Sequence, residues 1–472
     1  MQTRLPTEIR AAARLATSLL SVLAVLLAIA ASVTPVTYAK ISADDNLIQS
    51  ISVASKIRFG AGIDVRFDTK VNGDVSEARA IFTALGSRAV SSYAYPVLTS
   101  SPDGTGITAE FTIDTGIRTY FPPGTEFELR LELTDAGGEV SLSDPVRILY
   151  LDPTKPWRTL SEPGIRLDFH YYGFSEPTAQ GLADRAASSW QEIASALGLE
   201  PGSVDRFRAI VYPNVDAATS AFPPTSAAAT DGEYFGGFAM DRYGLFILGI
   251  PSPGTVVHEL THLLVGVKVN SPLSPGVPSW LNEGLAQYFE AGSSDYYSSR
   301  LRKAARENQL LVLRNRNTVP SQRSDISLFY LEAGSFVGEL IEMRGADRMA
   351  ETLGLINDGL VAADAVEAAY GVPLWQLENE WRVRLGASEL PPPATPTPAP
   401  ADTATPRPGS TPQATATAPG TSIGDTGATA GQQSPPNGGF SWTGPLAGAI
   451  AAGIVFSVWS FRVNRRRFRS RR

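Results

Sequence analysis

The chain of 472 residues contains no cysteine and only three histidines, at positions 170, 258 and 262. Without cysteine it can form no disulfide, no thiolate zinc site and no iron–sulfur cluster, and it has no cysteine nucleophile. A metal site built from three histidines would have to use all of them. The length is sufficient for two or three domains with more than one hydrophobic core.

Charged residues make up only 18% of the chain and are unevenly distributed. Residues 1–39 carry a net charge of +2, the seven arginines after Phe461 add +7, and residues 391–440 carry −1. Because the whole chain has a net charge of −7, the stretch 40–390 carries −15. A body this acidic repels phosphate backbones, which excludes nucleic acid as an expected partner.

The N-terminus resembles a targeting segment. Residues 15–39 contain no charge, three arginines precede them, and the run ends in Thr37-Tyr38-Ala39, with small residues at the two positions that a signal peptidase reads. Residues 1–39 are therefore predicted to be a secretory signal peptide. The apolar run is slightly long, so an uncleaved signal anchor stays an alternative. In both cases the chain that follows is exported.

A second apolar run lies near the C-terminus. Residues 442–461 are 20 uncharged residues, which as a helix would be about 30 Å long and span a bilayer. Trp442 and Trp459 stand near its two ends, and the tail 462–472 is rich in arginine. Because positive charge stays on the cytoplasmic side, we expect a single-pass protein of the cell membrane with the bulk of the chain extracytoplasmic. The membrane itself is thus a predicted partner, through the C-terminal helix.

Residues 391–440 consist mainly of Pro, Thr, Ala, Gly and Ser. Such a composition cannot bury enough apolar surface to fold, and its prolines favour extended chain. We expect a disordered linker that acts as a stalk, with an upper length on the order of 100 Å.

Residues 41–152 alternate between apolar and polar side chains, as in residues 107–113 and 127–133. Turn signals such as Asn72-Gly73 separate these runs. Short alternating strands at this spacing predict an all-β, immunoglobulin-like sandwich. No cluster of chemically reactive side chains stands out in it, so we interpret it as a spacer or docking module whose partner is unknown.

The pattern changes after Trp157. Apolar residues at helical spacing predict a helix over 176–197, short strands are expected at 207–212 and 245–250, and helical patterns then dominate to about Arg384. Residues 157–390 are therefore predicted to form an α+β domain.

One motif in this second domain carries chemistry. His258 and His262 are four residues apart, hence on one face of a helix, and they can converge on one metal ion. Glu259 lies about 100° around the same helix, near the metal but free to hold its water. The neighbouring residues are apolar, and two imidazoles with a carboxylate are costly to bury without a metal or other partners. The alternative is a pair of core histidines on a buried helix.

A hydrolytic zinc ion needs a third protein ligand and an open position for water. The metzincin pattern requires Gly at 265 and His at 268, where this chain has Val265 and Lys268. A carboxylate from a later helix remains, and residues 278–289 form an amphipathic helical pattern with Glu283 in its first turns. Glu283 is therefore the candidate third ligand. The alternative is an acidic residue that stabilises the start of its helix.

The segments His258-Glu259-Leu260-Thr261-His262 and Trp280-Leu281-Asn282-Glu283-Gly284-Leu285-Ala286 resemble the gluzincin metallopeptidases, which are thermolysin-like and also called peptidase MA-like. The Pro-Pro-Gly-Thr segment near residue 122 and the region 330–345 extend the similarity to exported bacterial members with an N-terminal β-sandwich.

The resemblance implies one Zn²⁺ per chain, with His258, His262 and Glu283 as ligands. It also implies Glu259 as the general base, which takes a proton from water at the zinc and passes it to the leaving amine. An edge strand at 244–250 would pair with an extended substrate.

The family usually provides a further donor to the oxyanion, and Tyr330 lies in about the right region of the sequence, although a core tyrosine fits the pattern equally well. His170 stands in an alternating run and is interpreted as a strand histidine rather than a ligand.

Two departures from the family bear on function. Residues 236–240 lack the Glu and Asn that follow in aminopeptidases and hold a substrate amine, which favours an endopeptidase. Gln287 stands where thermolysin-like enzymes place an aspartate behind a histidine ligand, so the outer partners of the ligands must come from elsewhere.

The sequence thus favours a membrane-tethered, extracytoplasmic zinc endopeptidase acting on protein or peptide substrates. A cell-surface adhesion or binding protein with a degenerate or structural metallopeptidase domain is the alternative. A third reading is an amidase for cell-wall peptides.

Overall fold

The computed structural model describes residues 37–40, 47–102, 104–200, 206–223, 236–291 and 298–393. The predicted signal segment before residue 37, the linker after residue 393 and the predicted span 442–461 lie outside the described residues. Within these ranges, no helix combines the length and the apolarity that crossing a bilayer requires.

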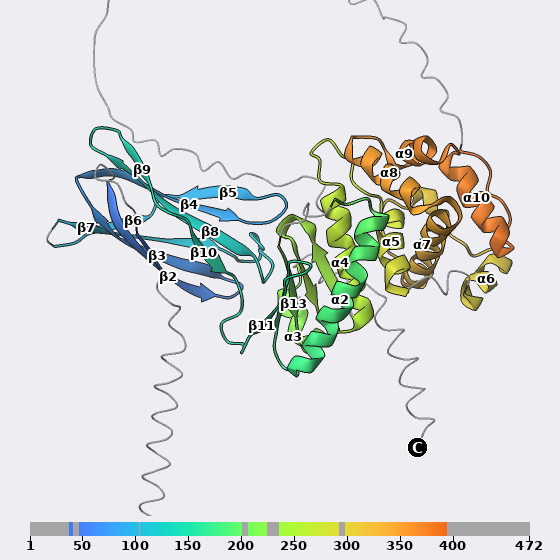
Figure 1. Cartoon of the computed structure of the whole chain (residues 1–472), viewed down its shortest axis with the longest axis horizontal. Helices are drawn as coiled ribbons and strands as arrows, with labels where there is room; N and C mark the ends of the chain where they lie inside the picture. The colour runs from blue at the N-terminus through green and yellow to red at the C-terminus, as the bar shows by residue number, and fades with distance from the viewer. Residues whose placement is uncertain are drawn as a thin grey trace, which may run out of the picture.

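The N-terminal region consists of two antiparallel sheets that lie face to face (Figure 1). The first has the order β1 (Thr37–Lys40), β2 (Ile48–Arg58), β3 (Gly62–Val71), β7 (Gly106–Asp114) and β6 (Val97–Ser100). The second has the order β10 (Val146–Leu149), β8 (Glu126–Asp135), β4 (Val75–Ala84) and β5 (Val90–Ala94), and β9 (Val140–Leu142) also pairs with β8. We call this region the sandwich. The expected β-rich N-terminal region is confirmed, and β1 includes the last three residues of the predicted signal segment.

The alternation seen in the sequence places every second side chain in the interior of the sandwich. In β8, Phe127, Leu129, Leu131 and Leu133 are buried, and the residues between them are half-buried. Because a strand directs successive side chains to opposite faces, one run of four apolar residues supplies one wall of the core.

The second module contains a mixed sheet with the order β11 (Arg158–Glu162), β12 (Leu167–Tyr171), β13 (Phe207–Val211), β15 (Leu245–Leu248) and β14 (Gly237–Met240). β12, β13 and β15 are parallel, whereas β11 and β14 are antiparallel to their neighbours. The prediction that the strand at 244–250 is the edge strand is wrong. β15 lies between β13 and β14, and the terminal strands among those described are β14, next to β15, and β11 at the other end.

Helices complete this module, and Figure 1 shows α5 to α10 to the right of the sheet. Their bounds are α2 Glu176–Ala196, α3 Val215–Ala218, α4 Pro253–Lys268, α5 Ser279–Ala291, α6 Ser299–Arg306, α7 Arg323–Arg344, α8 Ala346–Asn357, α9 Ala362–Tyr370 and α10 Leu374–Leu385. Short 3₁₀ turns occur at η1 Thr219–Ala221, η3 Asp241–Tyr243 and η4 Leu313–Asn315. The helix predicted over 176–197 is confirmed as α2. It is capped by Ser175, whose side chain accepts from the amide of Thr178.

The sandwich packs against the second module through the loop before β8. A Cβ on Gly124 would lie 2.4 Å from the side chain of Ile210, so only glycine allows this approach. Glu126 forms an ion pair with the buried Arg208, and the hydroxyl of Tyr120 donates to the carbonyl of Ala221 at 2.6 Å. The two modules therefore share a packed interface and are not separate units joined by a linker.

Candidate metal centre

The helix α4 carries the His-Glu-x-x-His motif. The residue before it, Ser252, caps the helix, because its side chain accepts from the amide of Thr255 at 3.1 Å. Pro253 stands in the first turn, where a backbone N–H would have no acceptor within the helix, so its absence in proline costs nothing. The residues from Thr255 to Val265 are all buried, which explains why apolar residues flank the motif on every face of this helix. The predicted helical placement of the motif is confirmed.

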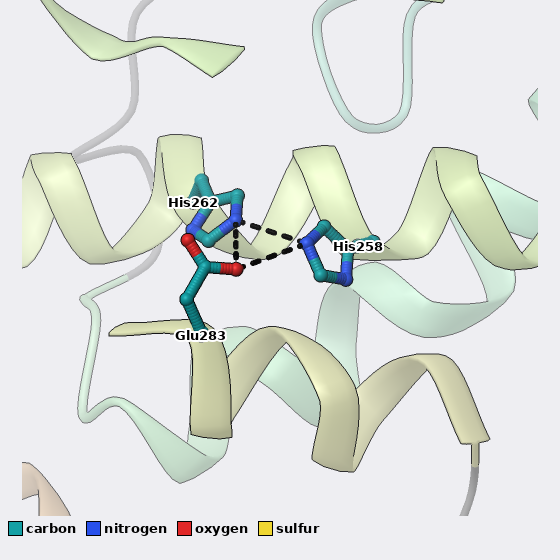
Figure 2. A group of neighbouring side chains, drawn as sticks. All are labelled: His258, His262 and Glu283. Atoms are coloured by element: carbon teal, nitrogen blue, oxygen red, sulfur yellow. Dashed lines mark hydrogen bonds and ion pairs between the residues drawn. The ribbon is translucent and has the colours of Figure 1, made fainter. Parts of the chain in front are cut away.

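The second helix of the site, α5, carries Glu283. Its first amides, on Ser279 and Trp280, donate to the carbonyls of Asn317 and Arg316 at 3.3 and 3.2 Å. These bonds replace the partners that a helix start lacks and fix α5 to the segment before α7. Figure 2 shows α4 and α5 side by side, with His258 and His262 directed from one helix toward Glu283 on the other.

Three ligand atoms meet between the helices. The Nε2 atoms of His258 and His262 lie 3.1 Å apart, and Oε2 of Glu283 lies 3.4 Å from the first and 3.5 Å from the second (Figure 2). Glu283 is fully buried, and the two histidines are almost so. The structure thus brings together the three residues that the sequence predicts as ligands, in a group that could hold a metal ion.

The other nitrogen of each histidine faces an acceptor. Nδ1 of His258 lies 3.0 Å from Oε2 of Glu290, an oxygen that also accepts from the side-chain Nε2 of Gln287 at 2.7 Å. That Nε2 lies 3.1 Å from Nδ1 of His258, so Gln287 contacts the histidine together with Glu290, and the expectation that the outer partners come only from elsewhere is wrong. Nδ1 of His262 lies 3.1 Å from Oδ1 of Asn282. With the protons on Nδ1, both Nε2 atoms direct lone pairs into the space between the helices.

These atoms fit a tetrahedral metal ion. Zinc ligands at about 2.0 to 2.2 Å from the metal lie about 3.3 to 3.6 Å from one another, close to the observed separations. Within the described residues, neither carboxylate oxygen of Glu283 has a hydrogen-bond partner. Two lone pairs and a buried carboxylate therefore converge with no donor to satisfy them, which is the arrangement that a cation completes.

The local field favours positive charge at this point. Burial opposes protonation of the two histidines, but the facing carboxylates of Glu283 and Glu290 raise the pKa of His258 well above its usual value, and Glu283 also raises that of His262. Burial alone would raise the pKa of Glu283, yet the two histidines hold it below its usual range. The same carboxylates would stabilise a metal cation between the two helices.

Glu259 lies beside the group without belonging to it. It is 1% exposed, and its Oε2 has no hydrogen-bond partner within the described residues. Burial raises the pKa of Glu259 to about 7, against the opposing effect of the two histidines. A Cβ on Gly237, the first residue of β14, would lie 2.8 Å from Oε1 of Glu259, so the terminal strand of the sheet begins directly beside this carboxylate.

The remaining candidates occupy different places. Tyr330 lies in α7, buried, with its ring centre 6.4 Å from that of His258. His170 lies in β12, where its Nδ1 is 3.0 Å from the hydroxyl of Thr159, and burial lowers its pKa to about 4. The structure brings Tyr330 near the histidines and leaves His170 in the sheet.

The outer partners Glu290 and Asn282 were not predicted. Glu290 follows Glu283 by seven residues, which is two helical turns, so both carboxylates lie on the same face of α5. That spacing was present in the sequence and could have suggested it. Asn282 is adjacent to the ligand, and only the crossing of α4 and α5 shows which nitrogen it meets.

With this geometry established, comparison with known proteins gives one match at the level of families. Residues 225–387 match the model of the Peptidase MA superfamily. The match makes this part of the chain similar to the Peptidase MA superfamily. We therefore call the second module the peptidase domain, and the match supports a gluzincin-type peptidase. It includes all three candidate ligands and does not extend to the sandwich.

Matches to solved structures are distant. An aminopeptidase N family protein from Idiomarina loihiensis is 11% identical, with a TM-score of 0.27 over 70% of this chain and 70% of that chain. A polysaccharide deacetylase from Bacillus cereus is 8% identical, with a TM-score of 0.17 over 36% of this chain, and the alignment spans 53% of that chain. Among curated proteins, none matches.

Proposed function

We propose that the chain is a zinc-dependent endopeptidase, tethered to the membrane and acting outside the cytoplasm. The observation that carries the catalytic part is the convergence of His258, His262 and Glu283, with Glu259 beside them, whose Oε2 has no hydrogen-bond partner among the described residues. The family match supports the same conclusion from the sequence.

Different residues bind the zinc ion and transfer the proton. The Nε2 atoms of His258 and His262 and a carboxylate oxygen of Glu283 would hold zinc, and Glu290 and Asn282 keep both imidazoles in the tautomer that binds it. Zinc in this position supplies a Lewis acid that polarises a carbonyl and lowers the pKa of water.

Glu259 then acts as the general base. Its carboxylate accepts a proton from the attacking water and delivers it to the nitrogen of the scissile amide, so one peptide bond and one water become a carboxylate and an amine. Burial raises the pKa of Glu259 in the metal-free chain, and a cation bound beside it would lower that pKa, so the carboxylate would be ionised and able to accept the proton. Tyr330 is proposed as a donor to the oxygen that becomes negative during attack.

The substrate is proposed to lie along β14 as an extended chain, because this terminal strand begins beside Glu259. After Met240 the chain continues into the turn η3, where Asp241 packs against Gly266 of α4. No glutamate or asparagine follows the strand to hold a free amine, which supports internal cleavage of polypeptides over removal of N-terminal residues.

Export and tethering are proposed from the termini. The uncharged runs at residues 15–39 and 442–461, with arginine before the first and after the second, support an extracytoplasmic body on a cytoplasmic C-terminal tail. Protease added to intact cells should remove the body and leave the C-terminal tail protected.

Metal content and turnover of the full chain test the catalytic proposal. We expect about one zinc per chain, lost in Glu283→Ala because only two ligands remain. Glu259→Gln should retain the zinc and lose cleavage of unfolded proteins by about 10²-fold or more. Glu307→Gln, at an exposed position of the same domain, serves as the matched control. Full activity in the Glu259 variant would overturn the mechanism, and a folded chain without zinc would overturn the metal site.

A further inference from the structure

The sandwich exposes a concentrated group of large apolar side chains. Within nine residues, five such side chains are between 41% and 71% exposed: Val90, Tyr93, Tyr95, Val97 and Leu98. We call these the β5–β6 patch. Apolar clusters of this kind are uncommon on soluble proteins unless they bind something.

The two strands that carry the patch also lie at the ends of their sheets, where their main chain can pair with a further strand. In the described part of the chain, β5 ends the order of one sheet and β6 ends that of the other, and only Tyr95 and Pro96 connect them. All four residues of β6 are exposed. Terminal strands offer main-chain donors and acceptors to any further strand, so this side of the sandwich presents apolar side chains and two strand edges together.

The patch is connected to the candidate site through β14. That strand begins at Gly237 beside Glu259 and ends at the turn η3, about 13 Å further on for four extended residues. At η3 the hydroxyl of Ser87 donates to the carbonyl of Asp241 at 2.6 Å, and the amide of Arg88 donates to that of Arg242 at 3.4 Å.

This contact is closely fitted. A Cβ on Gly86 would lie 2.1 Å from the carbonyl oxygen of Arg242, so only glycine fits there, and Tyr243 packs edge-on against Phe121 of the sandwich. β5 starts at Val90, two residues after Arg88. Figure 1 shows the turn between β4 and β5 directed toward the peptidase domain. An extended chain that follows β14 away from Glu259 is therefore led to the start of β5.

We propose that the β5–β6 patch is an exosite that binds the part of an unfolded polypeptide substrate remote from the scissile bond. The inference rests on the proposed function for what happens at Glu259, and on the contacts between residues 86–88 and η3 for the path between the two sites. The combined length of β14 and β5 corresponds to about ten extended residues of substrate.

The chemistry of the patch selects a polypeptide among its potential occupants. Tyr93 and Tyr95 meet edge to face, with 84° between their rings, and so do not form the flat platform on which a sugar ring stacks. The guanidinium of Arg79, which lies 5.9 Å from the ring centre of Tyr93, is paired with Glu132. Aliphatic side chains, two aromatic rings and strand edges suit an extended segment with apolar side chains.

Binding by the full chain tests the exosite without turnover. We would measure the Kd of fluorescently labelled β-casein, an unfolded protein, for Glu259→Gln and for the same chain with Tyr93→Ser, Tyr95→Ser and Val97→Ser added. The expected result is an increase in Kd of about tenfold or more. The matched control adds Val140→Ser and Leu142→Ser, which are exposed apolar positions on β9, at the other side of β8 from β4 and β5. Its Kd should not change.

A second measurement separates this inference from the proposed function. In the chain with Glu259 intact, the patch substitutions should raise KM for β-casein and leave kcat/KM for a six-residue peptide around one cleavage site unchanged. An unchanged Kd and KM with normal cleavage would overturn the exosite and leave the peptidase intact. Patch-dependent binding by a chain that cleaves nothing would overturn the peptidase and retain the polypeptide-binding surface. Loss of self-association in the patch variant, with no effect on casein, would assign the patch to contacts between copies and overturn the inference.

Discussion

The sandwich and the peptidase domain bury different kinds of polar side chains. In the described part of the sandwich all of them are hydroxyls: Thr69, Thr115, Thr125, Ser141 and Ser143. The peptidase domain buries carboxylates, imidazoles and guanidinium groups as well, including Glu259, Glu283, Glu332, Glu378, Arg208 and Arg382. Because a buried charge is costly unless it is paired, the second domain must hold its charges in fixed arrangements.

Some of these charges serve the architecture around the site. Glu332 accepts from the amide of Leu311 with both oxygens at 3.1 Å, and burial raises its pKa well above the usual value. Glu378 accepts from the amide of Leu313 at 2.7 Å and pairs with Arg314. The segment that they hold continues to the carbonyls on which α5 begins, so these carboxylates support the helix of Glu283 from a distance.

Among the changes that test this difference between the domains, Glu378→Ala should have the largest effect on the free energy of unfolding. The substitution leaves the amide of Leu313 without its acceptor and removes the carboxylate that pairs with Arg314, whose guanidinium keeps only its bond to the carbonyl of Pro391. It should lower the free energy of unfolding by about 3 to 5 kcal/mol. Urea denaturation of the full chain measures it. A loss below about 1 kcal/mol would mean that the buried charges are no more important than the hydroxyls of the sandwich.

A smaller effect is expected from pH through His170, which faces Asp168, Arg208 and Arg206. Its pKa is about 4 in the folded chain and 6.5 in the unfolded one, so above pH 6.5 it has no effect on stability. As the pH falls below 6.5 the unfolded state gains a proton first, and stability is lost until about pH 4. Between pH 7.5 and 4.5, wild type should lose about 2 to 3 kcal/mol more than His170→Gln. Parallel pH profiles for the two chains would contradict this.

Next in size is the expected contribution of Glu290 to the candidate metal site. Glu290→Gln keeps the shape of the side chain but weakens the acceptor for Nδ1 of His258, so zinc affinity should fall about 10- to 100-fold with little change in stability. Competition with a chromophoric chelator gives the affinity. Glu307→Gln is again the control, and an equal affinity in both variants would show that His258 is oriented by other contacts.

The smallest effect is expected in the sandwich, from Thr125→Val. The hydroxyl donates to the carbonyl of Pro122 at 2.7 Å, and that carbonyl also accepts from the amide of Thr125. Because the acceptor keeps one donor and the shape is retained, the loss should be about 1 kcal/mol or less by urea denaturation. A loss as large as that of Glu378→Ala would remove the contrast between the domains.

Local sequence patterns were sufficient to predict the helices and strands named below and to single out the three candidate ligands that the structure brings together. The alternation of β8, the helical spacing of α2 and the interval between His258 and His262 are properties of neighbouring residues, so each is visible in the sequence alone. The order of the strands within the sheet, in contrast, does not follow from a local pattern. β15 is more apolar than β14, but whether a strand is terminal depends on pairings with segments far along the chain.

The sequence by itself determined that His258 and His262 share one face of a helix, because helical periodicity fixes which residues share a face, and it made Glu283 on a later helix the candidate third ligand. Only the tertiary structure decided that α5 brings Glu283 within 3.5 Å of both histidines and places Glu290 behind one of them. It alone also decided that residues 86–88 of the sandwich meet the end of β14. Contacts between segments so distant in the chain depend on how whole elements pack, and no local pattern encodes that.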